Sequence, residues 1–337
     1  MLRRTIFDGV VFGFLLSVLA VAVLAPSEEQ LLQLGIVSIW VLAFFMLGCA
    51  FSIALAKLQT NTLGAVLFRQ VTHPEAEDRP WYRLFWKWQL VVSLLAAFVV
   101  AVVKTEFSFI ELFDQHGFAG AVRLFKGLLT PNWEVLPRAV LNIVETIFMA
   151  FLATSLAIPV AFVLSFVCAK NIMQGPAART VYFVLRTFLN VTRSIEALIW
   201  AIIFSVWVGI GPFAGMLALM IHSVASLAKQ YSEMVESVEE GPIEAIESTG
   251  ANKLQTIWYA IVPQVLLPYI SFTVYRWDIN VRMATIIGLV GGGGIGTMLV
   301  QYQGQAMWRE VGCIIVVIAV VVWALDQASA YIREALK

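Results

Sequence analysis

A short polar stretch, YRWDINVR at residues 275–282, interrupts a long apolar run. Asp278 and Arg282 are four residues apart, as are Arg276 and Asn280, so a helix would place each pair on one face. Near the middle of a membrane a charge costs at least a few kcal/mol, and it persists where it is paired or lines a wet cavity. The stretch therefore predicts either internal ion pairs or a polar lining for a small oxyanion, to which arginine presents fork-shaped donors.

Other polar residues lie inside apolar segments elsewhere in the chain, among them Asn142, Glu145 and Thr146. One interpretation is that such groups are satisfied internally and lock a helix bundle. This is the first expectation for Asp278, and for a lone histidine such as His222. The other interpretation is a lining for a passing anion. The candidates for such a translocation path are Arg193, Glu196, His222, Ser223, Arg276, Asp278, Asn280 and Arg282.

A glycine tract follows the polar stretch, and Gly291, Gly293 and Gly296 fit the spacing G-x-G-x-x-G. In a dinucleotide-binding fold this motif follows a strand and opens a helix, with an acidic residue about 20 positions later. Here a hydrophobic span precedes the tract, and no GK[ST] sequence follows it. We therefore predict no nucleotide site. Glycine also allows close packing and positive φ angles, which favours a sharply bent segment.

The composition places these residues in a membrane protein. The 337 residues are 60% hydrophobic and 13% charged, with a mean hydropathy of +0.85, whereas soluble domains are roughly 45–50% apolar and about 25% charged. The net charge of zero gives no argument for nucleic acid. We predict an all-α polytopic protein of about eight transmembrane helices, each needing about 20 apolar residues, at about 9–25, 31–56, 89–103, 139–168, 180–209, 212–230, 264–289 and 311–332.

The ends of the chain and its charges predict an orientation. The first span resembles a signal peptide, but its apolar run is long and a second span follows closely, so we expect a retained signal anchor. With both termini in the cytoplasm, the cytoplasmic segments hold most of the 22 Lys and Arg residues. Arg186 and Arg193 lie within the fifth span, which predicts that this span is broken. The three cysteines have no CxxC spacing, so we expect no metal site.

The connector at 231–263 is polar and is expected to face the cytoplasm. Gly241 and Pro242 are predicted to end one helix and to begin another, Pro242–Thr249, which stops at Gly250. Asn252 is a suitable cap for a second helix that stops near Pro263. A helix of about eight residues is marginal alone. This elbow also carries more apolar residues than an isolated loop needs: Ala245, Ile246, Leu254, Ile257 and Trp258.

The elbow resembles a known coupling motif. Glu244 and Ala245, then Gly250, then Pro263, stand at the spacing of the EAA…G…P motif of ABC importer permeases, with Ile246 in place of the second alanine. The resemblance implies that these four residues belong to an ATPase-coupling element. In that family the short helix docks into a groove on a separate ATPase subunit and transmits its closure to the membrane helices.

A narrower resemblance runs over roughly residues 89–335, through GPFAGMLALMIHS, VEEGPIEAIESTGANKLQTIWYAIVPQ and LDQASAYIRE. These segments are similar to phosphonate/phosphite-type permeases, relatives of the methionine importer permease. The resemblance implies a type I permease core at 139–337. Residues 1–88, predicted to hold two membrane helices and a cytoplasmic loop, form an extension that departs from the shorter family members. Residues 89–138 are predicted to form a membrane helix and an external segment, FAGAVRLFKGLLTPNW, whose pattern is amphipathic.

The same resemblance implies partners and a cargo. Two copies of the chain, expected to form a homodimer, would enclose the pore in the bacterial inner membrane. Two ATPase subunits, which bind the ATP and Mg, would lie inside and one substrate-binding protein outside. The chain itself would hold no cofactor and would pass phosphonate, phosphite, hypophosphite or phosphate. The family's outer gate lies in the region of Gly291, Gly292, Gly293, Gly294 and Gly296.

A different class of protein also remains open. An ion-coupled secondary transporter could use Glu145, Glu196 and Asp278 as intramembrane proton relays. Such a transporter has no reason to present the 231–263 elbow, which is the feature that separates the two hypotheses. A membrane-embedded enzyme is the third possibility, but the sequence offers no clustered His/Asp set or activated nucleophile for it.

Overall fold

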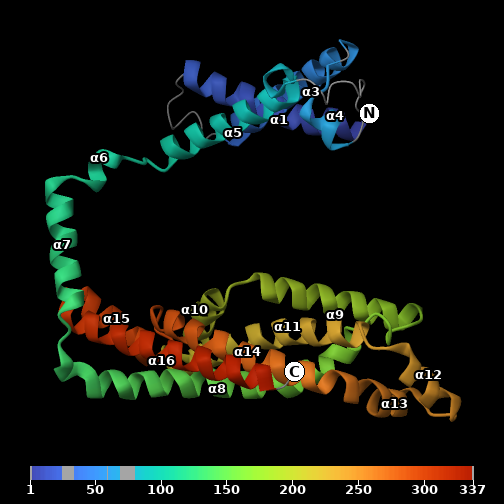
Figure 1. The fold of residues 1–337 in the computed structure, drawn as a ribbon, viewed down its shortest axis with the longest axis vertical. Coiled ribbons are helices and arrows are strands. Elements are labelled where there is room, and N and C mark those ends of the chain that lie inside the picture. The colour runs from blue at the N-terminus through green and yellow to red at the C-terminus, as the bar shows by residue number, and fades with distance from the viewer. Residues whose placement is uncertain (1, 25–33, 59, 69–79, 336–337) are drawn as a thin grey trace. The chain divides into compact units, whose positions relative to one another are not determined.

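The computed structural model describes residues 2–24, 34–58, 60–68 and 80–335. Its described regular elements are helices, and the chain divides into two compact units, Met1–Gly117 and Phe118–Lys337 (Figure 1). The division falls inside the segment 89–138. Its membrane helix packs in the first unit, and the rest of the segment belongs largely to the second.

The membrane helices follow the apolar segments. Six described stretches are long and apolar enough to cross a bilayer: Trp40–Lys57, Phe85–Lys104, Trp133–Val167, Pro212–Glu236, Lys253–Gly288 and Trp308–Ala335. A further pair, Pro176–Ser194 and Ala197–Val208, passes the same test together but is bent by 91°. The break in the fifth predicted span is therefore confirmed. The first predicted span, 9–25, corresponds to the helix Leu2–Leu24. Residue 25, the last of that predicted span, lies outside the described residues.

The first unit is held by a buried carboxylate. Asp8 is fully buried and accepts hydrogen bonds from Thr62 Oγ1 at 2.5 Å, Gly64 N at 2.8 Å and Ser52 Oγ at 3.2 Å. Arg4 Nε lies 3.8 Å from the same carboxylate. These contacts tie together the helices α1 (Leu2–Leu24), α3 (Leu34–Lys57) and α4 (Leu63–Leu67), against which α5 (Phe85–Lys104) packs.

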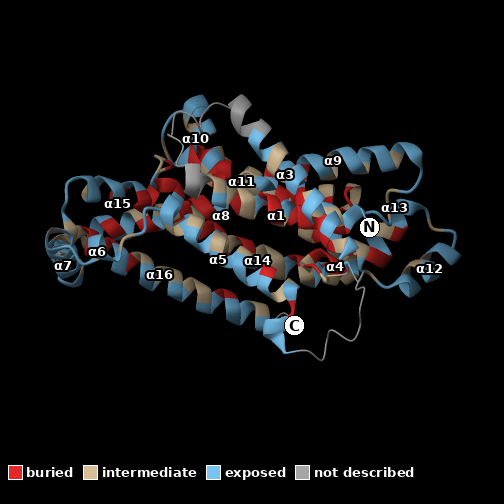
Figure 2. Cartoon of the chain, turned by 90° about the horizontal axis from the view of Figure 1, so that it is seen from above, coloured by how far each residue is buried: buried red, intermediate tan, exposed pale blue. Residues whose placement is uncertain are grey.

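The second unit is a bundle built on three long helices. Its helices are most of α7 (Gln115–Leu129), then α8 (Leu136–Val167), α9 (Pro176–Ser194), α10 (Ala197–Val208), α11 (Pro212–Glu236), α12 (Glu240–Ser248), α13 (Lys253–Thr256), α14 (Val262–Gly288), α15 (Gly294–Gly304) and α16 (Trp308–Ala335). Within this unit α11 packs against α8, α14, α9 and α10. Figure 2 shows buried residues along α8 and α11, whereas α9 and α12 are mostly exposed.

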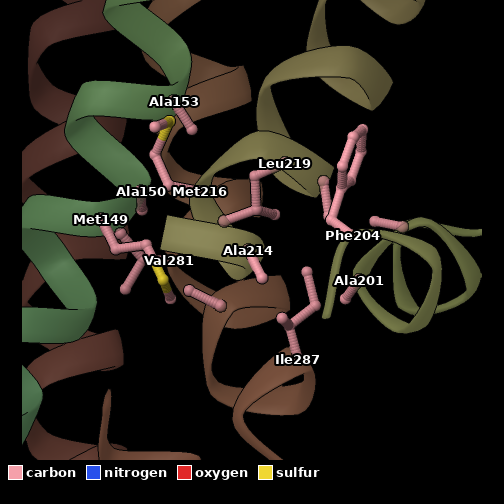
Figure 3. Close-up of a cluster of buried hydrophobic side chains, with 13 residues drawn as sticks. Met149, Ala150, Ala153, Ala201, Phe204, Ala214, Met216, Leu219, Val281 and Ile287 are labelled. Atoms are coloured by element: carbon pink, nitrogen blue, oxygen red, sulfur yellow. The ribbon is translucent and has the colours of Figure 1, made fainter. Parts of the chain in front are cut away.

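Small side chains bring the three central helices close together. Ala150 and Ala153 of α8, Ala218 of α11 and Ala284 of α14 are fully buried, and small residues let membrane helices approach closely. Larger side chains fill the remaining space, and Figure 3 shows Leu219 of α11 among its neighbours from α8, α10 and α14. This packing fixes the facing surfaces of α8, α11 and α14, on which the polar residues lie.

Candidate functional site

The charges of α14 separate onto two faces. On one face Arg282 Nη2 lies 2.5 Å from Asp278 Oδ2, and Arg282 Nη1 lies 3.3 Å from Asp326 Oδ1 on α16. The predicted i,i+4 pair is therefore confirmed, and it is extended to a triad. Asp326 was missed from the sequence, although it is an isolated acid in the last span. Both terminal nitrogens of Arg282 are engaged by carboxylates.

The other face of α14 points to α11 and α8. Arg276 Nε donates to Ser223 Oγ at 3.1 Å, and Asn280 Nδ2 donates to the same oxygen at 2.8 Å. Asn280 Nδ2 also lies 2.8 Å from Thr154 Oγ1. Thr154, which sequence reasoning missed, lies on α8, 126 residues away along the chain. All four residues are buried, so Ser223 is the shared acceptor of a polar cluster inside the bundle.

Unsatisfied polar atoms lie in this cluster and beside it. Asn280 Oδ1 is buried without a hydrogen-bonding partner among the described residues, and so are Trp277 Nε1 and His222 Nδ1, the chain neighbours of Arg276 and Ser223. Within the same part of the chain, Arg276 donates through Nε alone, which leaves its two terminal amino groups free to take another acceptor. Buried polar groups in native proteins are nearly all paired with protein or water. The cluster therefore has spare hydrogen-bonding capacity that water or a passing polar solute can use.

The bend between α9 and α10 brings further predicted residues to this cluster. Arg193 lies in the last turn of α9 and Glu196 is the N-cap residue of α10; both are exposed. Glu196 is within electrostatic range of Arg276, and both Arg193 and Arg276 are within range of His222. The structure thus brings Ser223, Arg276 and Asn280 into contact, leaves Arg193, Glu196 and His222 within electrostatic range of this group, and sets Asp278 and Arg282 apart, toward α16.

The glycine tract forms the turn between α14 and α15. Gly293 has φ +80°, and a Cβ there would lie 2.6 Å from Pro212 Cγ at the start of α11. Ile295 N, just beyond, donates to Thr146 Oγ1 on α8 at 2.9 Å. The predicted bend and close packing are therefore confirmed, and Thr146 has a partner in this turn. A helix rather than a strand precedes the tract.

The elbow follows the sequence prediction with two corrections. Gly250 has φ +83°, which favours glycine, and Asn252 and Gln255 form a capping box at the start of α13. However, α11 already ends at Glu236, and α12 begins at Glu240, two residues before the predicted start, so Gly241 lies inside α12 and does not end the preceding helix. Pro242 lies in the first turn of α12, where backbone N–H groups have no helical partner anyway.

The second correction concerns Pro263, which does not stop a helix. A π-helical turn, Ile257–Ile261, comes directly before it, and Pro263 then lies in the first turn of α14. A proline inside a regular helix lacks a donor and clashes with the carbonyl four residues earlier. The wider π-turn is a local departure from the α-helical ladder at the point where that conflict would arise. The elbow is therefore continuous with the membrane helix α14.

The surface of the elbow is partly packed and partly open. Ile243 and Ile257 pack against the bundle core, whereas Leu254 and Trp258 are 78% and 61% exposed. Glu244 and Ala245 are exposed on α12. A cavity of about 360 Å³ lies between the elbow and the loop that joins α8 to α9, and its lining includes Glu236, Glu240, Glu244, Glu247 and Lys253. Such an exposed mixture of apolar and acidic groups is typical of a docking surface.

Comparison with known proteins identifies the family. Residues 161–336 match the model of the binding-protein-dependent transport system inner membrane component. The chain is also 33% identical over 245 residues to the phosphite transport system permease protein PtxC of Stutzerimonas stutzeri, covering 72% of this chain and 88% of that one. The chain belongs to this permease family.

Other relatives of the permease differ in length. The phosphate-import permease protein PhnE of Mycolicibacterium smegmatis is 32% identical over 248 residues, which is 73% of this chain but 45% of that protein. The chain thus spans about half the length of that relative. A solved structure of the inward-facing MetNI methionine ABC transporter contains a similar chain. The match covers 61% of this chain and 99% of the MetNI chain, with a TM-score of 0.53 and 21% identity. This likeness shows that the permease has the type I importer fold.

The matched region holds the features described above. It contains the bent pair α9–α10, the elbow, the glycine turn and three residues of the polar cluster, Ser223, Arg276 and Asn280, whereas Thr154 lies before it. The helices α1, α3, α4 and α5 lie before it. The protein is therefore a multi-pass membrane component of a transport system, carrying an additional N-terminal unit.

Proposed function

We propose that this permease is the membrane-spanning subunit of an ATP-driven importer for phosphonate or a related phosphorus oxyanion, such as phosphite, hypophosphite or phosphate. The observation that carries the proposal is the elbow, which exposes Glu244, Ala245, Leu254 and Trp258 and is continuous with α14. Relatives named for phosphite and phosphate transport support the class of cargo. Membership of this family disfavours the ion-coupled transporter.

The proposed assembly has two copies of the permease around a pore, two cytoplasmic ATPase subunits and one external binding protein. ATP and Mg act in the ATPase subunits, and the permease performs no chemistry itself. When ATP closes the ATPase pair, the two elbows move together and the pore opens outward to receive the anion. Both termini lie in the cytoplasm of a bacterial cell, in agreement with the excess of Lys and Arg in the cytoplasmic segments.

Within the path, Arg276 is the better candidate than Arg282 for contact with the anion. Arg282 is already neutralised by Asp278 and Asp326, at 2.5 and 3.3 Å. Arg276 is held only through Nε, by the neutral oxygen of Ser223. Its terminal nitrogens can therefore form charge-assisted hydrogen bonds with a phosphorus–oxygen group. A single arginine of this kind attracts the anion without the tight cage that would slow its release.

The glycine turn is the proposed outer gate. Three of its residues, Gly291, Gly293 and Gly294, have positive φ angles, and the turn packs against Thr146 of α8 and the start of α11 at Pro212. A turn wedged between two core helices responds to any change in their separation. Movement of α14 away from α8 and α11 would therefore loosen this contact on the external side.

Gly250→Asp tests the coupling function. The added side chain and negative charge fall on the exposed elbow beside Glu247, where a Cβ has open space but the φ of +83° strains an L residue. This strain is about 1–2 kcal/mol and is confined to the turn, so the permease should still insert and assemble. We expect uptake to be lost in a complex with its ATPase and binding protein. Gly250→Ala is the matched control, since it imposes the same backbone strain at φ +83° without the negative charge. Normal uptake by Gly250→Asp would refute the coupling role, and uptake assayed across the four anions identifies the cargo.

A further inference from the structure

We propose that α9 carries the movement of the elbow to the polar cluster, and that Arg186 and Glu236 are the positioning residues that hold α9 to the elbow end of α11. This inference rests on the proposed function, because it assigns a coupling route between the elbow and the path. Neither residue touches the anion. They act by fixing where α9, and with it Arg193, lies.

The contact between Arg186 and Glu236 joins three parts of the second unit. Arg186 Nη1 lies 2.6 Å from Glu236 Oε1, at the last residue of α11, and 3.1 Å from the carbonyl of Cys168 at the end of α8. Lys170 N, in the loop between α8 and α9, donates to the same Glu236 oxygen at 2.9 Å. The two side chains are 24% and 27% exposed, so the pair is partly shielded from water. It clamps α9 to the junction of α8 and α11.

The same junction is where the elbow begins. Glu236 lines the cavity beneath the elbow together with Ile243 and Glu244 of α12. Three residues further along from Glu236, Glu239 N donates to Gln264 Oε1 on α14 at 3.0 Å. A displacement of α12 therefore reaches α14 directly through the chain, and reaches α9 through Glu236.

The geometry of α9 extends this contact to the polar cluster. Arg186 and Arg193 are seven residues apart, which puts them on one face, about 10 Å apart along the axis. Arg193 lies at the 91° bend, within electrostatic range of His222. Figure 1 shows α9 running alongside α11, with α12 and α13 beyond one end and α10 at the other. A short helix moves largely as one body, so displacing α9 at Arg186, near its middle, also displaces Arg193. The distance between Arg193 and Arg276 then changes, and with it the positive charge at the path.

The test is a charge-swap cycle measured in the complete importer. Arg186→Gln and Glu236→Gln should each lower the number of anions imported per ATP by roughly tenfold, the change that 1.4 kcal/mol of coupling represents. The swap Arg186→Glu with Glu236→Arg should recover part of that ratio, because it restores the ion pair but not the hydrogen bonds to the Cys168 carbonyl and from Lys170 N. Arg186→Lys, which keeps the charge but loses the planar fork, should fall between. Uptake, ATP hydrolysis and the thermal unfolding temperature are measured on the same purified complex.

Arg179→Gln is the matched control. Arg179 lies seven residues before Arg186 on the same face, and in the described part of the chain its side chain makes no ion pair. This variant should keep the wild-type ratio of uptake to hydrolysis.

The outcomes separate this inference from the proposed function. If Gly250→Asp abolishes uptake while both Gln variants keep the wild-type ratio, α9 is not the coupling route although the importer function holds. If the Gln variants fail to assemble, the charge swap and Arg186→Lys decide whether α9 is the coupling route. Recovered coupling supports the inference, whereas an assembled but uncoupled swap overturns it.

Discussion

Ser223→Ala is the sharpest test of the polar cluster, because one oxygen accepts from two buried donors. Removing it leaves Arg276 Nε and one hydrogen bond of Asn280 Nδ2 without their acceptor, at distances that are now 3.1 and 2.8 Å. Asn280 is fully buried and retains its second bond, to Thr154. The variant therefore leaves the Asn280 amide with one hydrogen bond in place of two, and leaves the charged Arg276 Nε without an acceptor.

The magnitude follows from which donor is stranded. Hydrogen bonds between membrane helices average only about 0.6 kcal/mol, because the unfolded chain in the membrane also finds partners. Leaving a buried donor unsatisfied costs about 1–3 kcal/mol, and more when it is charged. We therefore expect Ser223→Ala to lower the free energy of unfolding by about 2–3 kcal/mol. It should also slow uptake, since Arg276 is no longer held in place.

The assay is reversible unfolding of the permease in mixed micelles, beside uptake by the assembled importer. Ser205→Ala is the matched control. It removes a serine hydroxyl from α10 whose hydrogen bond, 2.7 Å to the Ala201 carbonyl, stays within its own helix. That control should change the unfolding free energy by less than about 1 kcal/mol. Equal effects of the two substitutions would show that Ser223 is not the shared acceptor of the cluster, and the reasoning would fail.

Two further predictions concern buried charges. Arg282→Ala should destabilise the permease, because Asp278, whose side chain is 5% exposed, loses its closest cation. Arg276→Gln should instead slow uptake, with the stability of the permease and its affinity for the binding protein unchanged. Unfolding curves and uptake rates of the two variants check this, and the opposite pattern would make Arg282 the path residue. In the first unit, Asp8→Ala should cost about 3–5 kcal/mol, because Arg4 and three neutral donors lose a buried acceptor. Protease resistance of the N-terminal helices measures this, with Asp8→Asn expected to be milder; wild-type resistance in Asp8→Ala would contradict it.

Rules about residues close together in the sequence were enough to predict much of the local structure of this protein. Long apolar runs predict membrane helices because backbone groups in lipid must bond within their own segment. The i,i+4 spacing predicted the Asp278–Arg282 pair, and the residue types at Gly250 and Asn252 predicted the elbow's turn and cap. Each of these features depends on residues within a few positions of one another, so the sequence contains the information directly.

Contacts between distant segments were decided only by the tertiary structure. Asp326 on α16 completes the triad of Arg282, and Thr154 on α8 meets Asn280. Which charges of α14 face α11 and which face α16 depends on how three helices pack, and no spacing along α14 determines that.

Dependence on the surrounding structure also explains why the sequence prediction for Pro263 was wrong and why the contact between Arg186 and Glu236 was not predicted. Pro263 stays within a helix because the preceding turn is π-helical, a feature that propensity alone does not predict. The contact between Arg186 and Glu236 joins residues 50 positions apart. The sequence by itself determined that charges lie within the membrane segments and that a polar helical elbow follows α11. Only the packing of the bundle decided which of those charges are neutralised and which remain free to meet an anion, because pairing depends on the distances between helices.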